Sequence, residues 1–499
     1  MFLYSAIYII DPFFAEKLLI SMNQVIGRIQ EITILRALCD SSEPQFLAVY
    51  GRRRIGKTFL ISQFFRDKGI YFELTGIKDA DLKTQLSNFA REYADAFNTG
   101  KPIATPATWI DAFDLLRKRV QQNAGRDKII LFLDELPWLA SPQSRFLPAL
   151  DHTWNRYLSR AKNIIVIICG SAASWMIKKV LHDKGGLHGR LTRTMRLLPF
   201  TLAETRRFLE VNQISLTAPQ VIELYMALGG VATYLTQMQT GQSVNQLIQA
   251  RYFDRNAPLK SEFHKLFSSL FSNYENHLAV IESLAASHYG LTGQQLLAKL
   301  AKTRMRSGGT FTSLLSELVE SGFITFLPQF GNKKRIGKYL LTDEFSLFYV
   351  KWVRQWESEL ADMEGHWQRQ ANSQSFRVWA GYAFETLCVK NIAQIKQQLG
   401  IAGVTTRISQ WHDEGAQIDL VIDRADNCIN LCEIKFYSAQ LVLSAKEADN
   451  LRRKKARFLQ ATQTRKALFT TLITVNGFTR NQHYVRAVDS HVYAEKFIE

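Results

Sequence analysis

The sequence predicts a multidomain α/β protein with a parallel β-sheet in its N-terminal part, a helical middle and a second α/β domain at its C-terminus. Three apolar runs, at residues 46–50, 129–133 and 164–168, are short and continuous, which is typical of parallel strands buried on both faces. Beyond residue 200 the apolar spacing becomes helical, and strand-like segments with charged residues return at 416–435. The 499 residues are enough for about three domains with cores of their own.

The first apolar run is followed by a complete phosphate-binding loop pattern, G-x-x-x-x-G-K-[ST], and then by a helix-like stretch at 59–65. Glycines let the backbone curl so that its N–H groups point at a phosphate, and the helix N-terminus adds positive potential. We expect Lys57 to contact the β- and γ-phosphates of ATP and the Thr58 hydroxyl to bind Mg²⁺. The expected nucleotide contacts are Gly51, Arg52, Arg53, Arg54, Ile55, Gly56, Lys57 and Thr58. The alternative is a glycine turn that binds nothing.

Two acidic residues follow the second apolar run. A nucleotide site of this kind has an acid at the end of a strand next to the phosphate loop. Asp134 and Glu135 directly follow the strand predicted at 129–133. We expect Asp134 to hold Mg²⁺ through water and Glu135 to polarise the attacking water, with Lys57 assisting on the phosphates. The pattern therefore predicts an ATPase that converts ATP and water to ADP and phosphate. The alternative is a strand-end acid that caps the next turn.

The third apolar run ends in small polar residues. It continues through Cys169 and Gly170 to Ser171, whose hydroxyl is our first candidate for sensing the γ-phosphate, with Ser174 second. The alternative is a strand that leaves through a Gly-Ser cap into a helix.

Taken together, these motifs resemble the archaeal and bacterial AAA+ (STAND-like) P-loop ATPases that carry a winged helix and a C-terminal PD-(D/E)XK nuclease-like domain. The resemblance runs from about Met22 to the C-terminus. It is carried by the arginine-rich phosphate loop and by the segments Val25 to Arg28, Leu133 to Trp138, Cys169 to Ser171, Leu187 to Arg190 and Leu198 to Phe200.

The resemblance implies two further features of the nucleotide site. Arg190 matches the family's arginine after the last core helix, which makes it a candidate phosphate-sensing or finger arginine; the alternative is a surface arginine. The family's Gly-Gly-Ile-Pro-x-Tyr-Leu segment in the helical lid corresponds to Gly229 to Leu235. Ala232 stands where the family has proline, which puts that contact with the nucleotide in doubt.

The middle of the chain predicts a helical lid followed by a winged helix. Helices are expected near 278–284, 292–300 and 310–318, and two strands at 323–328 and 338–341 enclose a basic tip at 331–335. We expect DNA contact through the third helix, preceded by Lys302, Arg304 and Arg306, and through the wing. The alternative is a winged helix that only connects domains.

The expected domains are an extension at 1–21, an ATPase core at 22–200, a lid at 201–258, a winged helix at 259–350, a helical linker at 351–375 and a nuclease-like domain at 376–499.

The last domain has the second set of chemical residues. Asp419 lies on a predicted strand at 416–423, and Glu433 and Lys435 lie two apart on the next strand, so those two share one face. Two carboxylates side by side suit Mg²⁺ or Mn²⁺, and the lysine can orient a hydroxide that attacks a phosphodiester. The pattern resembles the PD-(D/E)XK nuclease core, in which an upstream helix often supplies a further acid, here Glu385.

A basic helix follows these strands, with Lys446, Arg452, Arg453, Lys454, Lys455 and Arg457 available to follow a phosphate backbone. The alternative is a decayed nuclease fold that is kept as a binding or assembly module, because residue identity does not show whether a metal is bound.

Composition agrees with a nucleic-acid partner. The chain has 62 Lys and Arg against 45 Asp and Glu, a net charge of +17, which favours DNA as the acidic partner; the alternatives are a basic protein without such a partner and attraction to a membrane surface. Five cysteines without a paired framework argue against zinc and favour a reducing, cytoplasmic location. Residues 1–21 have neither a basic start nor a cleavage site for secretion, and no uncharged run there is long enough to span a membrane. A translation start at Met22 is an alternative.

The sequence therefore predicts a cytoplasmic, ATP-driven protein that binds DNA and has a metal-dependent nuclease-like domain. The alternative is a STAND-type switch in which the ATP or ADP state controls assembly and the C-terminal domain cuts nothing. A homo-oligomer is compatible with either hypothesis.

Overall fold

The computed structural model describes residues 25–123, 127–141, 143–181, 187, 189–236, 238–271, 273–300, 308–331, 336–357 and 363–499. The predictions made for residues 1–21, for Lys302, Arg304 and Arg306, and for the wing tip at 332–335 lie outside these residues. The chain divides into two compact units, residues 1–198 with 207–213, and residues 199–206 with 214–499. Each unit is described by itself below.

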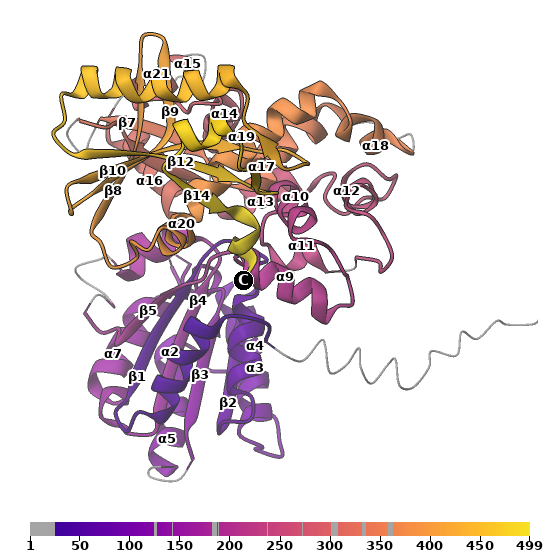
Figure 1. Ribbon diagram of the computed structural model, residues 1–499. Coiled ribbons are helices and arrows are strands. Elements are labelled where there is room, and N and C mark those ends of the chain that lie inside the picture. Colours follow the sequence, from indigo (N-terminus) through magenta and orange to yellow (C-terminus); the bar gives the residue numbers. More distant parts are fainter. Residues whose placement is uncertain are drawn as a thin grey trace, which may run out of the picture. The chain divides into compact units, whose positions relative to one another are not determined.

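The N-terminal unit contains a parallel five-stranded sheet in the order β2-β3-β4-β1-β5 (Figure 1). Its strands are β1 (Gln45–Tyr50), β2 (Ile70–Thr75), β3 (Ile129–Asp134), β4 (Ile164–Gly170) and β5 (Arg193–Arg196). Every residue of β3 and β4 is buried, as expected for central strands that are covered on both faces. The predicted α/β fold with a parallel sheet is confirmed.

Helices cover both faces of this sheet because alternate residues of each strand point in opposite directions. Leu47 and Val49 of β1 join a core with α2 (Ile29–Asp40) and α3 (Lys57–Phe65). Phe46 and Ala48 join the opposite core with α4 (Leu82–Ala96), α5 (Trp109–Gln122) and α7 (Phe146–Arg156). The short helices α6 (Leu136–Leu139) and α8 (Ala173–Met176) follow β3 and β4 at the carboxyl edge of the sheet.

The C-terminal unit begins with helices. After α9 (Leu202–Val211), which crosses the boundary between the units, come α10 (Ala218–Leu228), α11 (Ala232–Leu235), α12 (Val244–Tyr252) and α13 (Glu262–Leu270). Next come α14 (Tyr274–Ala285), α15 (Gly293–Lys299), α16 (Gly309–Glu320) and an antiparallel pair, β6 (Ile324–Pro328) and β7 (Gly337–Leu341). Leu291 adds a single antiparallel bridge to Tyr339 of β7. The three helices and two strands expected between 278 and 341 are therefore present.

The glycine pair at Gly229 and Gly230 ends α10 and packs within this unit. Gly230 accepts a hydrogen bond from the Phe200 N–H at 2.7 Å, and a Cβ atom there would lie 1.9 Å from the Phe200 carbonyl oxygen. Only glycine permits this approach of two backbones. Packing against Phe200 therefore accounts for the glycine at position 230 without reference to a nucleotide.

The last part of the unit is a mixed five-stranded sheet in the order β14-β12-β10-β9-β8 (Figure 1). Its strands are β8 (Thr406–Asp413), β9 (Ala416–Arg424), β10 (Cys428–Lys435), β12 (Ala467–Thr474) and β14 (Ser490–Tyr493). Strands β8, β9 and β10 pair antiparallel, whereas β10, β12 and β14 pair parallel. A small parallel pair, β11 (Leu441–Val442) and β13 (Phe478–Thr479), lies outside the main sheet.

Helices precede and follow the strands of this sheet along the chain. They are α17 (Glu344–Phe348), α18 (His366–Ala371), α19 (Gln374–Lys390), α20 (Ile392–Gln398), α21 (Ala445–Thr462) and α22 (Gln482–Ala487). Helix α19 contacts β10, and α21 packs on the sheet through Phe458, whose ring lies 5.2 Å from that of Trp411. Among the described residues, no helix combines the length and apolar character that crossing a membrane requires.

Candidate functional sites

The phosphate loop lies between the end of β1 and the start of α3, at the carboxyl edge of the parallel sheet. Gly51 has φ 151° and approaches the backbone of Leu197 so closely that a Cβ would lie 2.2 Å from its carbonyl oxygen. Gly56 has φ 89°, in the region that favours glycine, and stands immediately before α3. Arg54 also has positive φ, at 68°. The two glycines therefore allow the tight curl that a phosphate-binding loop needs.

The lysine of the loop is folded into it. Lys57 is 6% exposed, and its Nζ donates to the carbonyl oxygens of Gly51 at 3.1 Å and Arg52 at 3.0 Å. Arg28, which sequence reasoning did not place in the site, is buried and donates from Nη2 to the Ile55 carbonyl at 3.2 Å. It thereby braces the loop from outside. Its signal in the sequence was only its place in the segment Val25 to Arg28.

Two oxygen ligands suited to Mg²⁺ meet beside the loop. The Thr58 hydroxyl donates to Asp134 Oδ2 at 2.6 Å, although the residues are far apart in sequence. Asp134 is 3% exposed at the end of β3, and its other oxygen accepts from the Glu135 N–H at 2.9 Å. A hydroxyl and a carboxylate are the hard oxygen donors that Mg²⁺ prefers. The residues present therefore fit a magnesium ion at this position.

Glu135 and Ser171 form one unit. Glu135 has φ 47°, a left-handed backbone that is uncommon outside glycine and often found at functional sites. Its Oε2 accepts from the Ser171 hydroxyl at 2.8 Å and from the Ser171 N–H at 3.2 Å. Adjacent strands β3 and β4 bring the two residues together. The sequence pattern indicated a separate role for each residue and did not predict the hydrogen bond between them.

Arg190 lies elsewhere in the N-terminal unit. It precedes β5, which runs parallel to β1, so it stands at the amino edge of the sheet, whereas the phosphate loop follows the carboxyl end of β1. Its Nε lies 3.6 Å from Asp151 Oδ1, and its side chain is 45% exposed. The structure therefore does not bring Arg190 to the phosphate loop of its own chain.

The second candidate site lies on the mixed sheet. Leu420 of β9 pairs with Cys432 of β10, and the neighbouring residues Asp419 and Glu433 lie just beyond this last pair. Asp419 Oδ2 also accepts from the Ile434 N–H at 2.9 Å. The two carboxylates are thus brought together across neighbouring strands.

Two lysines hold Glu433. Lys435 Nζ lies 2.9 Å from its Oε1, and Lys454 Nζ lies 2.6 Å from its Oε2. Burial raises the pKa of Glu433, which is 7% exposed, but the charges of Lys435 and Lys454 outweigh burial and the net pKa is lowered. Burial lowers the pKa of Lys435, but Glu433 outweighs it and the net pKa is raised. Glu433 is therefore ionised and Lys435 protonated at neutral pH. Lys454 was expected only as part of a basic helix face.

The other two carboxyls of the site have raised pKa values. Burial and then the Glu433 charge raise the pKa of Asp419 to about 6. Burial, and then the charges of Asp419 and Glu433, against the opposing effect of Lys435, raise the pKa of Glu385 on α19 to about 9. Glu385 is therefore within electrostatic range of the two strand acids.

Carboxylate oxygens are the ligands that Mg²⁺ or Mn²⁺ prefers, so the donor set fits a divalent cation. The present positions do not complete such a site: in the part of the chain that the structure describes, no group of three or more His, Cys, Asp or Glu side chains is placed to hold a metal ion. Each oxygen of Glu433 already accepts from a lysine. A cation that binds Glu433 would therefore compete with one of these two lysines.

Comparisons with known proteins agree with the geometry of the first site. Residues 26–238 match the family described as an ATPase domain predominantly from Archaea. This segment is a P-loop ATPase domain. Residues 349–451 match a second family, described as archaeal and bacterial proteins of unknown function.

Individual relatives are distant. A protein of Methanocaldococcus jannaschii, described as uncharacterised, is 22% identical over 403 residues, which are 79% of this chain and 83% of that protein. The solved structure of a Walker-type ATPase of Pyrococcus abyssi is 16% identical, with a TM-score of 0.47, and covers 66% of this chain and 96% of its own. The ORC2 protein of Aeropyrum pernix, solved in ADPNP and ADP complexes, is 16% identical, with a TM-score of 0.39, and covers 66% and 93%. No functional conclusion follows from likenesses this low.

Beyond the ATPase domain, several basic residues of α21 pair with acids of this chain. Lys455 pairs with Asp489 and Arg457 with Asp413, both at 2.9 Å. Arg452 pairs with Asp449 one turn away, and Lys454 turns into the carboxylate site. Most of these charges are therefore neutralised within the chain.

Proposed function

We propose that the chain uses ATP binding and hydrolysis in its P-loop ATPase domain to control a PD-(D/E)XK nuclease-like domain at 376–499 that acts on DNA. The observation that carries the proposal is that Asp419 accepts a hydrogen bond from the Ile434 N–H, next to Glu433, while Lys435 forms an ion pair with Glu433. An acid-bearing helix, three antiparallel strands, a helix and a parallel strand follow one another in the order this nuclease core requires. The ATPase domain supplies the nucleotide-driven step.

In the ATPase domain, the loop residues 51–58 would surround the phosphates with backbone N–H groups. Lys57 would exchange the carbonyls of Gly51 and Arg52 for phosphate oxygens, since it already points into the loop. Thr58 and Asp134 would hold Mg²⁺, which neutralises phosphate charge when bound. Glu135 would accept a hydrogen bond from the attacking water, and Ser171 holds that carboxylate in place.

In the C-terminal domain, Asp419 and Glu433, with Glu385 as a third acid, would hold a divalent cation, which lowers the pKa of bound water and screens phosphate charge when present. Lys435 would stand beside the nucleophile and stabilise its negative charge. Asp419 is held in register by the Ile434 N–H. The site is built on two strands and a helix, which keeps its geometry rigid.

The remaining parts support contact with DNA. We propose that residues 201–258 are the lid, 259–350 a winged helix and 351–375 a linker. Three helices followed by a hairpin support the winged helix, and the net charge of +17 supports an acidic partner. Arg190, at the far edge of its own sheet, would act as a finger on a neighbouring copy in a homo-oligomer.

The experiment that tests the proposal incubates the purified chain with plasmid and linear DNA, with and without ATP, in Mg²⁺ or Mn²⁺. We expect cleavage that needs the divalent ion and is lost in Asp419→Ala. Lys435→Ala should keep metal binding and lose most cleavage, because it removes a charge at the nucleophile and not a ligand. ATP hydrolysis measured without DNA should be unchanged in both variants. A wild-type chain that cuts neither substrate, or an Asp419→Ala chain that cuts as well as wild type, contradicts the nuclease.

A second candidate function is a STAND-type switch whose C-terminal domain recognises a partner without cleavage. The observation that favours it is the double lysine clamp on Glu433, which neutralises the site without a metal. A switch should turn over ATP very slowly and retain ADP tightly, whereas DNA-stimulated hydrolysis favours the first function. Single-turnover ATPase assays with and without DNA separate the two.

A further inference from the structure

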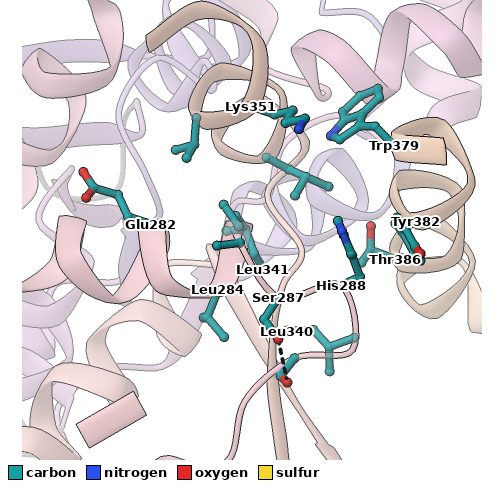
Figure 2. Close-up of a pocket in the computed structure, with 15 residues that line it drawn as sticks. Glu282, Leu284, Ser287, His288, Leu340, Leu341, Lys351, Trp379, Tyr382 and Thr386 are labelled. Carbon is teal, nitrogen blue, oxygen red and sulfur yellow. Dashed lines mark hydrogen bonds between the residues drawn. The ribbon is translucent and has the colours of Figure 1, made fainter. Parts of the chain in front are cut away.

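A cavity of about 270 Å³ lies within the C-terminal unit (Figure 2). Its walls come from the end of α14 and the loop after it, from β7, from α17 and the segment that follows it, and from α19. This is far more space than one ordered water needs, so the cavity has room for part of a small organic ligand. The floor is apolar and includes Leu340, Leu341, Leu347 and Val350.

Two nitrogen donors at this cavity have no strong acceptor. Trp379 is 5% exposed, and no described residue accepts a hydrogen bond from its Nε1. Buried N–H groups are nearly always satisfied, so this one calls for an explanation. Lys351 is exposed and pairs with no described carboxylate; its Nζ lies over the Trp352 ring at 5.6 Å. Figure 2 shows the nitrogens of Lys351 and Trp379 turned toward the same end of the cavity.

The carboxylate that lines the same cavity is already neutralised. Glu282 Oε1 lies 2.9 Å from Arg354 Nη1. The hydroxyl of Ser287 donates to the Gly290 carbonyl, as Figure 2 shows, and that of Thr386 donates to Ala383. Of these two charged lining residues, Glu282 is therefore in an ion pair, whereas Lys351 forms none with a described residue and favours an anion.

An aromatic wall closes another side. The rings of His288 and Tyr382 stack at 3.8 Å with an interplanar angle of 8°, and Tyr289, 45% exposed, meets Tyr382 edge-on at 6.1 Å. The phenol of Tyr289 has its pKa raised by burial and by Tyr382, and also by the nearby charges of Glu385 and Asp419. Tyr289 is therefore within electrostatic range of the carboxylate site. Thr386 of the cavity is also the next residue after Glu385 on α19.

We infer that this cavity binds a nucleoside phosphate, with the phosphate at Lys351 and Trp379 and the base against the aromatic wall and apolar floor. Lysine binds phosphate as a point charge, the indole N–H gains its missing acceptor, and bases stack well on aromatic rings. The ligand is either a free nucleotide or the terminal nucleotide of a 5′-phosphorylated strand. The inference rests on the proposed nuclease, whose substrate end this cavity would hold.

The test uses the full chain carrying Lys57→Ala, so that the phosphate loop contributes no nucleotide binding, in EDTA. Calorimetry measures binding of dTMP, thymidine, inorganic phosphate and a 5′-phosphorylated single-stranded oligonucleotide. We expect dTMP to bind at least tenfold more tightly than thymidine, and Lys351→Met to remove that difference. Trp379→Phe, which keeps the ring and removes the donor, should weaken dTMP binding several-fold.

The matched control is Lys83→Met, an exposed lysine on α4 of the other unit, which should bind dTMP like its parent. Tighter binding of the oligonucleotide than of dTMP identifies a strand end as the ligand, and binding of dTMP alone identifies a free nucleotide. Equal binding of dTMP and thymidine, or no effect of Lys351→Met, overturns the inference. Because EDTA prevents metal-dependent cleavage, the binding measurement does not depend on whether the nuclease is active. A chain that cuts DNA but binds no dTMP contradicts the inference about the cavity and leaves the proposed nuclease standing.

Discussion

Replacing Lys454 by methionine tests the carboxylate site most directly. Lys454 is 17% exposed, and its Nζ lies 2.6 Å from Oε2 of Glu433, which is 9% exposed in its side chain. Methionine keeps the length and apolar stem of lysine and removes only the charge. The other oxygen of Glu433 keeps Lys435. The variant therefore exposes one carboxylate oxygen to whatever cation is present.

The magnitude follows from the geometry. At an effective dielectric constant of about 20, two unit charges 2.6 Å apart attract by roughly 6 kcal/mol, and desolvation of both groups offsets much of this. Breaking a buried ion pair costs about 3–5 kcal/mol when it leaves a lone charge. Because Lys435 remains, we expect Lys454→Met to lower the free energy of unfolding by about 2 kcal/mol in EDTA.

The assay is urea unfolding without nucleotide, in EDTA and then in Mn²⁺. Mn²⁺ at about one hundred times its Kd would restore about 2.7 kcal/mol, because the cation takes the place that Lys454 leaves. The matched control is Lys455→Met, one residue along α21, whose pair with Asp489 is more exposed and should contribute about 1 kcal/mol or less. If Lys454→Met unfolds like the parent in EDTA, or gains no more from Mn²⁺ than Lys455→Met does, Lys454 does not hold the cation position.

The other predictions concern both sites. Lys57→Ala should weaken ATP binding at least a hundredfold, whereas Glu135→Gln should retain binding and lose hydrolysis at least a hundredfold, as measured by fluorescent nucleotide binding and phosphate release. Ser171→Ala should lower turnover about tenfold with ATP affinity kept, because it frees the Glu135 carboxylate; an equal loss of affinity would contradict that positioning role. The raised pKa of Asp419, about 6 against an ordinary 3.8, means that the folded chain binds more protons than the unfolded chain between about pH 4 and 6, so stability falls as pH rises through that window. Asp419→Asn should therefore gain roughly 1–3 kcal/mol at pH 8 in EDTA and nothing near pH 3.5, and a gain that does not depend on pH would contradict this cause.

Much of the ATPase domain was predictable because its signals are local. The phosphate loop needs glycine at two positions whose backbone other residues rarely adopt or cannot fit, and buried parallel strands need unbroken apolar runs. Those features are written in consecutive residues. They led to the loop, the acidic strand end of β3 and the parallel sheet, which the structure contains.

The partners within each site were not predictable, because they depend on which strands become neighbours. The sequence did not indicate that Ser171 holds Glu135 or that Arg28 braces the loop at Ile55. It placed Arg190 among the nucleotide contacts, yet parallel pairing of β5 with β1 sets it at the opposite edge of the sheet. Such contacts join residues tens of positions apart, and no local pattern records them.

The sequence by itself determined the two candidate sites, a phosphate loop with an Asp-Glu strand end and a pair of strand acids with a lysine, because both patterns consist of particular residues at fixed short spacings. The tertiary structure alone decided their electrostatic state. The basic residues of α21 were predicted to face DNA, but helix packing turns Lys454 onto Glu433 and leaves Lys455 and Arg457 paired with acids. Charge on a helix is visible in the sequence, whereas the groups that neutralise it are chosen by the packing of the helix on the sheet.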